Sequence, residues 1–281
     1  MSRETVRMRS VRRLVRGEET WDGAGVRLTR VIGTRGLLQL DPFLLLDDFR
    51  SDDPDDYIGG FPPHPHRGFE TVTYLLAGRL EHRDNAGHAG VLRAGGVQWM
   101  TAGRGVVHSE MPMQEDGLLA GFQLWVNLPA KHKMTTPRYQ ELDADSISRE
   151  QREGGVTMRV VAGETGNGTR GPVEDLATPV SYFDVSLPAG TSFAEPLPRD
   201  YNAFVYLVEG EVRIGGETIP SRALAELGAG EGIEIEAPTA SRLLLVAGRP
   251  LNEPVARRGP FVMNHEAELR QAFDDYQAGR F

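Results

Sequence analysis

The chain has 281 residues and a formal net charge of −9 at neutral pH, which argues against the broad basic surface that binding to nucleic acid requires. It contains no cysteine, so disulfides, thiolate catalysis and cysteine-ligated zinc or iron–sulfur sites are excluded. The sequence has no run of about 20 apolar residues to span a membrane, and no apolar signal segment follows its basic N-terminal residues. We therefore expect a cytoplasmic protein that binds neither nucleic acid directly nor a membrane.

The first 16 residues form a basic stretch in this otherwise acidic chain. Arginines are interleaved there with apolar residues such as Val11 and Leu14. A pattern of this kind is typical of a strand with one buried face. It predicts an edge strand or a docked arm in preference to a DNA-binding tail.

Short strand-like runs follow one another along the rest of the chain, and each ends at glycine or proline. Four of them cover residues 70–76, 119–128, 156–161 and 180–187. Such spacing is typical of β-sandwiches and barrels, and the 33 glycines and 18 prolines favour the same turn-rich architecture. The sequence therefore predicts an all-β protein.

A helix is expected at the C-terminal end, from an N-cap at Asn264 to a stop near Gly279. A basic, proline-containing linker at residues 129–138 is the best candidate for a domain boundary. We therefore predict two domains, residues 1–135 and residues 136–281, with the helix in the second range.

An internal repeat indicates two copies of one unit. Tyr-Leu-Leu-Ala-Gly at residues 74–78 matches Tyr-Leu-Val-Glu-Gly at residues 206–210, and a second glycine-containing turn follows in both copies. Because each copy reads as strand, turn, strand, turn and strand, both domains are expected to share one β fold.

Two pairs of potential metal ligands lie in the first copy. His64 and His66 are separated by a proline, and His108 and Glu110 by a serine. Alternate side chains of an extended chain share a face, and Pro65 disfavours a helix, so each pair presents two ligands on one side. If the two strands are neighbours, three imidazoles and a carboxylate converge, and this set suits a first-row divalent ion. The competing interpretation is that these are ordinary surface or core side chains.

His82 and His88 are weaker candidates for metal binding. They lie in a polar segment, Glu-His-Arg-Asp-Asn-Ala-Gly-His, that contains a turn-forming glycine. We expect both side chains to be exposed to solvent.

The second copy lacks a comparable set of ligands. The spacing of the repeat places four residues that bind no metal opposite the four candidates, namely Pro196, Pro198, Leu243 and Leu245. Moreover, no histidine occurs between Lys133 and Asn264. We therefore expect the second domain to be a structural or binding module without this site.

Long motifs of the chain resemble the pirin family. The N-terminal half of pirins is similar to GGFPPHPHRGFETVTYLLAG, GGVQWMTAGRGVVHSEMP and GFQLWVNLPAKHKMTTPRYQEL, and the pirin tail is similar to GPFVMNHEAELRQAFDDYQAGRF. Pirins belong to the cupin superfamily, so the resemblance implies two facing cupin-type β-barrels, with a C-terminal helix that packs on the first one. It also assigns one divalent metal ion to His64, His66, His108 and Glu110.

Glu70 is a competing carboxylate ligand. Many cupins carry a glutamate ligand three or four residues after their His-x-His pair, and Glu70 stands at that spacing. The pirin resemblance assigns the role to Glu110 instead, which shares a face with His108. The alternative reading of Glu70 is a polar side chain at the start of a strand.

The resemblance implies an oxidoreductase, a metal-dependent dioxygenase of the quercetinase kind that opens a flavonol-like ring with O2. Glu110 would then take the proton of the substrate hydroxyl, and Fe(II) is favoured, with Ni, Mn, Cu or Zn as alternatives. The rival implication is a regulator that binds a transcription factor or a metabolic enzyme and responds to the redox state of its metal. A third reading gives the metal a purely structural role.

Overall fold

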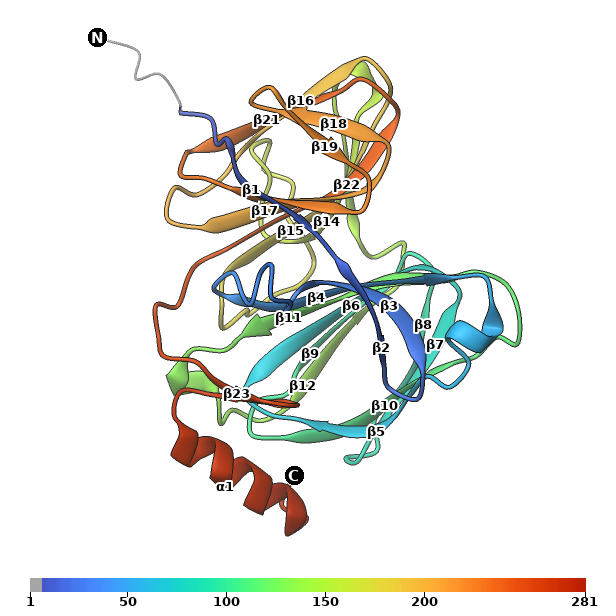
Figure 1. The fold of residues 1–281 in the computed structure, drawn as a ribbon, viewed down its shortest axis with the longest axis vertical. Helices are drawn as coiled ribbons and strands as arrows, with labels where there is room; N and C mark the ends of the chain where they lie inside the picture. The colour runs from blue at the N-terminus through green and yellow to red at the C-terminus, as the bar shows by residue number, and fades with distance from the viewer. Residues whose placement is uncertain (1–6) are drawn as a thin grey trace. The chain divides into compact units, whose positions relative to one another are not determined.

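The computed structural model describes residues 7–281. The first six residues, among them Arg3 of the predicted basic arm, lie outside the described part. The chain forms two compact units built mainly of strands (Figure 1). Unit 1 contains the described residues up to Gly17 together with Ser146–Pro250, and unit 2 contains Glu18–Asp145 together with Leu251–Phe281.

Unit 2 consists of two antiparallel sheets, a terminal hairpin and a helix. The strands of its larger sheet are β2 (Glu18–Asp22), β3 (Val26–Ile32), β4 (Phe43–Ser51), β6 (Phe69–Ala77), β9 (Val97–Thr101), β11 (Leu119–Asn127) and β12 (Arg138–Leu142). Those of the smaller sheet are β5 (Phe61–His66), β7 (Arg79–Asp84), β8 (Ala89–Arg93) and β10 (Val106–Pro112). The remaining elements are β23 (Ala256–Arg258), β24 (Phe261–Met263), helix α1 (Glu266–Gln277) and two short 3₁₀ turns at Pro54–Asp56 and Ala130–His132. The spatial orders are β12-β9-β6-β11-β4-β3-β2 and β5-β10-β7-β8.

Unit 1 repeats this architecture. The strands of its larger sheet are β1 (Val11–Arg16), β13 (Ser148–Gln151), β14 (Thr157–Ala162), β15 (Val180–Leu187), β17 (Asn202–Glu209), β20 (Ala223–Leu227) and β22 (Ser241–Gly248). Those of the smaller sheet are β16 (Thr191–Pro196), β18 (Glu211–Ile214), β19 (Glu217–Pro220) and β21 (Gly232–Ala237), and a 3₁₀ turn covers Glu153–Gly155. The spatial orders are β1-β20-β17-β22-β15-β14-β13 and β16-β21-β18-β19.

Strand for strand, the two units have the same order, so the predicted duplication is confirmed. The matching pentapeptides occupy equivalent places, because β6 ends before Gly78 and β17 ends before Gly210. Both glycines adopt the left-handed conformation, with φ of 87° and 88°, which a side chain would disfavour. The predicted all-β architecture with one C-terminal helix is confirmed as well.

The units divide the chain differently from the predicted ranges 1–135 and 136–281. β12 pairs with β9 in unit 2, which therefore continues to Asp145. At the N-terminus, β1 pairs with β20 of unit 1, and the final segment Leu251–Phe281 belongs to unit 2. Each end of the chain therefore belongs to the unit opposite to the one predicted for it. The reason is that domain membership depends on which distant strand each end pairs with or packs against.

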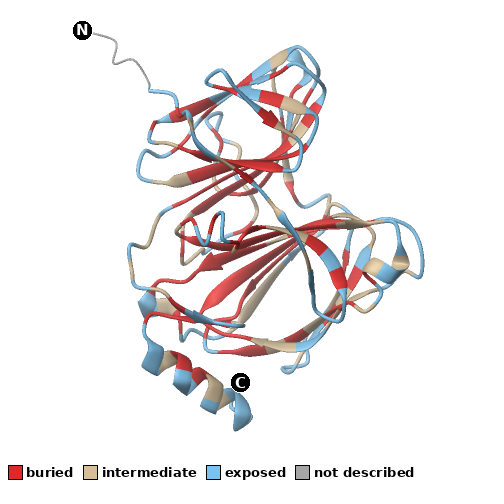
Figure 2. Cartoon of the chain, viewed as in Figure 1, coloured by how far each residue is buried: buried red, intermediate tan, exposed pale blue. Residues whose placement is uncertain are grey.

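The two sheets of unit 1 face each other across an apolar core (Figure 2). The core draws on both sheets, for example on Phe183 and Leu245 from the larger and Ile214 and Ile235 from the smaller. In unit 2 a smaller apolar cluster joins the two sheets, with Leu75 facing Leu80 and Leu92. Polar side chains are also buried in unit 2, and some of them form the site described below. The sheets of each unit are separate and do not close into continuous barrels.

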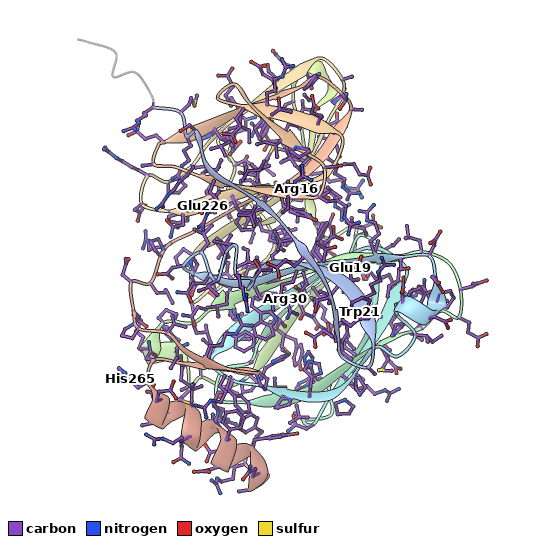
Figure 3. All side chains as sticks on the ribbon, viewed as in Figure 1. Arg16, Glu19, Trp21, Arg30, Glu226 and His265 are labelled. Carbon is purple, nitrogen blue, oxygen red and sulfur yellow. The ribbon has the colours of Figure 1, made fainter. Side chains whose placement is uncertain are left out.

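Helix α1 packs on unit 2, as the family resemblance implied. Its buried residues Leu269 and Ala272 contact the apolar residues of β23 and β24. The N-cap is His265, labelled in Figure 3, one residue later than the predicted Asn264. Glu268 explains the shift, because its carboxylate accepts hydrogen bonds from the backbone N–H groups of both Asn264 and His265. Among the described residues, no helix is long and apolar enough to cross a membrane.

The basic N-terminal arm forms the edge strand β1, as predicted for its described part. Its register with β20 is antiparallel and places Val15 opposite Leu224. Arg13 donates a 2.8 Å hydrogen bond to the buried carboxylate of Glu226 (labelled in Figure 3), and Arg12 lies 3.3 Å from the same group. The arginines of this arm therefore neutralise an acidic side chain of the protein itself.

Candidate metal centre

Strand β5 carries the first pair of histidines, and its prolines explain its position. Pro62, Pro63 and Pro65 have no N–H to donate to a sheet, so a strand that contains them is tolerated at an edge. β5 is the edge strand of the four-stranded sheet and pairs only with β10. The prolines also keep the chain extended, so that His64 and His66 project to the same face.

Strand β10 brings the third histidine directly opposite the first. His108 is the cross-strand partner of His64. The ring centroids are 4.5 Å apart for His64 and His108, 4.6 Å for His64 and His66, and 5.1 Å for His66 and His108. One nitrogen from each ring lies within 4.8 Å of the other two, a spacing that one metal ion can bridge. The structure therefore gathers the three predicted imidazoles into one cluster.

The hydrogen bonds of these rings leave nitrogens free for a metal. His64 Nδ1–H donates to the Pro62 carbonyl oxygen at 2.9 Å, which fixes the proton there and leaves the Nε2 lone pair available. Among the described residues, neither ring nitrogen of His66 or of His108 has a hydrogen-bond partner, although both rings are buried. An unpaired buried imidazole is costly, and a divalent ion would provide a partner for one nitrogen of each ring. The donor set therefore fits a metal.

Burial keeps two of the imidazoles neutral at physiological pH. Desolvation lowers the pKa of His66 well below its ordinary value, and the neighbouring His108 and His64 add to this effect. The Pro260 carbonyl opposes the shift without forming a well-aligned hydrogen bond. Desolvation also lowers the pKa of His108, to about 4. Only neutral imidazole binds a metal, so the site is prepared for one.

Glu110, the predicted fourth ligand, is the next inward-facing residue of β10. Its carboxylate is buried and accepts hydrogen bonds of 3.0 Å from Thr73 Oγ1 and from Gln123 Nε2. A bulge separates the two pairs, because His108 lies opposite His64 while Glu110 lies opposite Phe61. The group of ligand atoms within 4.8 Å comprises the three histidines, and a metal-binding role for Glu110 stays a prediction. The sequence did not point to Thr73 and Gln123.

Glu70 faces away from the histidine cluster. Its neighbour Phe69 packs against His66 with ring centroids 5.1 Å apart, and side chains alternate along a strand, so Glu70 projects to the opposite face of β6. There its carboxylate accepts hydrogen bonds from Thr101 Oγ1 at 2.6 Å and from Trp99 Nε1 at 3.0 Å. The alternative of Glu70 as a metal ligand is therefore disfavoured by its direction.

The prediction that His82 is exposed is wrong, whereas His88 is exposed as expected. His82 belongs to β7, where Leu80 and His82 are buried and Arg79, Glu81 and Arg83 are not. Its Nε2 lies 2.6 Å from a carboxylate oxygen of Glu141, and it stands opposite Glu110 on β10. The alternation along β7 could have revealed this burial, but the glycine-containing turn that follows obscured it.

Lys133 and the C-terminal segment that contains β24 and α1 support the turn that follows β5. Gly68 has a φ of 89°, and a Cβ there would lie 1.9 Å from the Val262 carbonyl oxygen, so only glycine fits. Lys133 Nζ donates to the carbonyl oxygens of Gly68, at 2.8 Å, and Val262, at 3.0 Å. Arg67 forms a 2.7 Å ion pair with Asp275 of α1. The end of the chain is therefore part of the scaffold that holds the histidine cluster.

In the place equivalent to the histidine cluster, unit 1 has apolar residues and a buried carboxylate, Glu195, which is paired with Arg152. The equivalent strands are β16 and β21, whose inward-facing cross-strand partners include Phe193 and Ile235. The predicted alignment of Leu243 and Leu245 with His108 and Glu110 is wrong, because those leucines belong to β22, the equivalent of β11. The offset shifted because the connections between strands differ in length. Among the described residues, the histidine cluster of unit 2 is the group found that could hold a metal.

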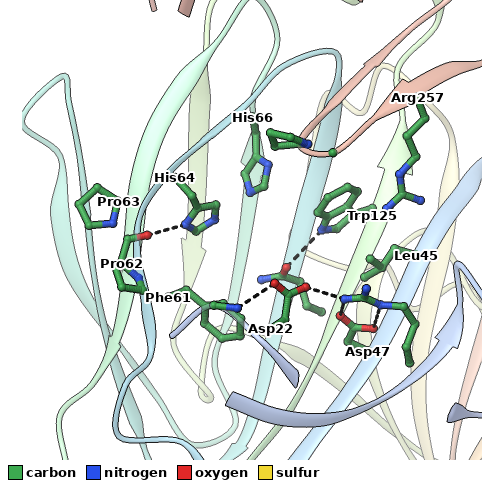
Figure 4. A pocket seen from close by; sticks show the side chains of 15 residues that line it. Asp22, Leu45, Asp47, Phe61, Pro62, Pro63, His64, His66, Trp125 and Arg257 are labelled. Atoms are coloured by element: carbon green, nitrogen blue, oxygen red, sulfur yellow. Dashed lines mark hydrogen bonds and ion pairs between the residues drawn. The ribbon is translucent and has the colours of Figure 1, made fainter. Parts of the chain in front are cut away.

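The histidine cluster opens into a cavity of about 530 Å³ in unit 2 (Figure 4). His64 and His66 line one side, with Phe61 and the prolines of β5 beside them. Trp125 and Arg257 line the opposite part, together with the acidic residue Asp47. The cavity can therefore admit a molecule of the size of a few fused rings to His64 and His66, past both apolar and charged walls.

A duplicated pair of facing β-sheets, with a candidate histidine metal site in one copy, defines a protein of the cupin class with two cupin domains. The model of the pirin family matches residues 25–126, and that of the pirin C-terminal cupin domain matches residues 182–281. A pirin-like protein of Caulobacter vibrioides is 55% identical over 98% of this chain and 99% of its own length. The chain belongs to the pirin family.

Two further relatives carry the name of an enzyme. A Pseudomonas aeruginosa protein, whose name gives quercetin 2,3-dioxygenase as a provisional activity, is 46% identical over 97% of this chain and 98% of its own. The crystal structure of an Acinetobacter baumannii quercetin 2,3-dioxygenase is similar with a TM-score of 0.91 and 34% identity, over 98% of this chain and 99% of that one.

Proposed function

We propose that this pirin is a metal-dependent dioxygenase of the quercetinase kind, which opens a flavonol-like ring with O2 and releases one ring carbon as carbon monoxide. The observation that carries the proposal is the cluster of three histidines, two of which, His64 and His66, line an open cavity. A purely structural metal needs no such access. The names of the Pseudomonas and Acinetobacter relatives support the same reaction.

His64, His66 and His108 would hold the ion, and Glu110 is the proposed fourth ligand. When bound, a divalent ion supplies Lewis acidity to a substrate oxygen and a route for electrons to dioxygen. Three nitrogens and a carboxylate suit several first-row ions, with Fe(II) favoured and Ni, Mn, Cu and Zn as alternatives. His64 is held in the required tautomer by Pro62, so its Nε2 needs no rearrangement to bind.

Glu110 is the proposed general base. A flavonol must lose the proton of its 3-hydroxyl group before its ring reacts with dioxygen, and the Glu110 carboxylate would accept that proton. Thr73 and Gln123 donate to its two oxygens and thereby orient the group. Gln123 also accepts a 3.2 Å hydrogen bond from Trp125 Nε1, which links the base to the cavity wall.

The test is oxygen consumption and carbon monoxide release with quercetin, after the protein has been loaded with each candidate metal. Glu110→Gln keeps the size of the side chain and removes the base, so we expect turnover to fall by about 100-fold or more, while metal content changes less. Glu70→Gln is the matched control, because it alters a buried carboxylate on the other face of β6. Equal rates for wild type and Glu110→Gln would refute the role of the base, and no turnover with any metal would refute the enzyme.

The second candidate is a metal- and redox-responsive regulator that binds a transcription factor or a metabolic enzyme. It is favoured by unit 1, which has a large apolar core and in which the described residues contain no candidate metal cluster. Metal-loaded protein without dioxygenase turnover, combined with partner capture that changes between oxidised and reduced iron, would support this function over the first.

A further inference from the structure

The cavity beside the histidine cluster has a charged end in addition to the imidazoles. Arg30 and Asp47 lie on adjacent strands of the larger sheet, and Arg257 comes from β23 near the end of the chain. Figure 4 shows Arg257 projecting toward the same space as Trp125 and Asp47. Two guanidinium groups therefore stand at one end of a pocket whose other end carries the candidate metal ligands.

The two arginines differ in how their charge is compensated. Arg30 donates to both oxygens of Asp47, at 2.9 and 2.8 Å, and to Asp22 at 2.7 Å. Arg257 donates a 2.8 Å hydrogen bond to the Leu44 carbonyl oxygen and, within the described part of the chain, forms no ion pair. Partial burial and the neighbouring Arg30 lower the pKa of Arg257, and Asp47 opposes this effect. Arg257 thus brings a positive charge to the pocket without a carboxylate of its own.

A row of contacts links Arg257 to the histidine cluster. The guanidinium carbon of Arg257 lies 4.8 Å from the centroid of the Trp125 ring, in a cation–π contact. Trp125 in turn packs against His66 with centroids 5.3 Å apart. Its indole is fixed by the hydrogen bond to Gln123 and by stacking on Phe69 at 4.2 Å. The ring of Trp125 therefore fixes the distance between the charge of Arg257 and His66.

We propose that Arg257 binds a carboxylate at the end of the substrate that is remote from the metal, so that the pocket selects planar aromatic carboxylates. The guanidinium group matches a carboxylate in shape and charge, and Arg257, which has no ion-pair partner among the described residues, can form such a pair. Trp125, Phe61 and the prolines of β5 provide flat apolar walls for the ring system between the two ends. The inferred substrate class rests on the proposed function for the reaction itself. Binding of the carboxylate, however, can be measured without turnover.

The test compares 4′-carboxy-3-hydroxyflavone with its carboxamide, which has the same shape without the charge. Binding is followed by calorimetry and by quenching of tryptophan fluorescence, on metal-loaded and on chelated protein. Loss of a hydrogen-bonded charge pair is expected to raise Kd by about tenfold. We expect Arg257→Gln to weaken binding of the carboxylate by that factor and to leave the carboxamide unchanged. Arg257→Lys should recover part of the loss.

Arg258→Gln is the matched control. Arg258 is the next residue of β23, is exposed and pairs with Glu266 of α1, outside the lining of the pocket. Equal affinities of the wild type for carboxylate and carboxamide would overturn the inference, as would an equal loss for both ligands in Arg257→Gln, which would indicate a packing role on Trp125. If Arg257→Gln does not fold, the comparison of the two ligands on wild type and Arg257→Lys decides. Binding without turnover would refute the dioxygenase and leave the inference standing.

Discussion

At the scale of single residues, His66 and His108 combine complete burial with unsatisfied ring nitrogens. Leaving buried polar groups unpaired costs about 1–3 kcal/mol each, so the metal-free site is a local weakness in an otherwise well-packed unit. A ligand that binds only the folded state stabilises that state by mass action. The same feature that prepares the imidazoles for a metal therefore couples metal binding to the stability of unit 2.

We expect added divalent metal to raise the melting temperature of the chelated wild-type protein. At a free metal concentration of 100 times Kd, the stabilisation is about 2.7 kcal/mol. His108→Ala should abolish this shift, because it removes one of the three clustered ligands. His88→Ala is the control, since His88 is exposed and bonded to Asp84. Thermal unfolding with and without metal measures the effect, and an undiminished shift in His108→Ala would contradict the site.

At the scale of elements, the turn between β5 and β6 connects the histidine pair to the terminal hairpin. Gly68 lies in this turn, where its backbone N–H donates to the Gly103 carbonyl oxygen at 2.8 Å. The close approach of Val262 leaves no room for a side chain. The metal ligands of β5 keep a fixed position only if the end of the strand is fixed, and this contact fixes the end of β5.

We expect Gly68→Ala to destabilise the protein by at least about 1–2 kcal/mol and to weaken metal binding, because the new methyl group would displace either β24 or His66. Gly87→Ala provides the comparison. Gly87 has a φ of 94°, similar to the 89° of Gly68, but nothing lies within 4 Å of a Cβ placed there. Chemical denaturation and metal titration of both variants separate backbone strain from the clash. Equal metal affinities in the two variants would show that the Val262 contact does not position the ligands.

At the scale of the whole molecule, each unit takes a strand or a hairpin from a distant part of the chain. β1 covers the edge of β20 in unit 1, with Val15 buried at 5% exposure and Val11 and Leu14 packed against the apolar core. In unit 2 the corresponding edge is covered by β12, which is close in sequence to its neighbours. An uncovered edge strand is prone to pair with other chains, so β1 protects unit 1.

A chain that begins at Gly17 lacks this strand. We expect faster amide hydrogen exchange in β20 and concentration-dependent association, because the edge of β20 becomes free to pair. Metal content should be unchanged, since the histidine cluster belongs to unit 2. Hydrogen-exchange mass spectrometry, light scattering and elemental analysis provide the measurements. Unaltered exchange in β20 would mean that β1 contributes nothing to the edge, and loss of metal would mean that the units are coupled.

Local patterns in the sequence were sufficient to predict the strands, the duplication and the cluster of three histidines. A strand alternates its side chains with a period of two, so His-Pro-His and His-Ser-Glu identify residues that share a face before any partner is known. The final helix was predicted for the same kind of reason, since its capping residues are adjacent in sequence. Its start was one residue off because Glu268 bonds to two backbone groups.

Only the tertiary structure decided which segments meet. The direction of Glu70, the burial of His82, the exchange of both chain ends between the units and the arrival of Arg257 at the cavity all depend on pairing and packing between residues far apart in the chain. The chain determines by itself which side chains lie on one face of each strand, because backbone geometry sets the alternation. Which faces come together is settled by long-range hydrogen bonds and burial, and these have no local signature.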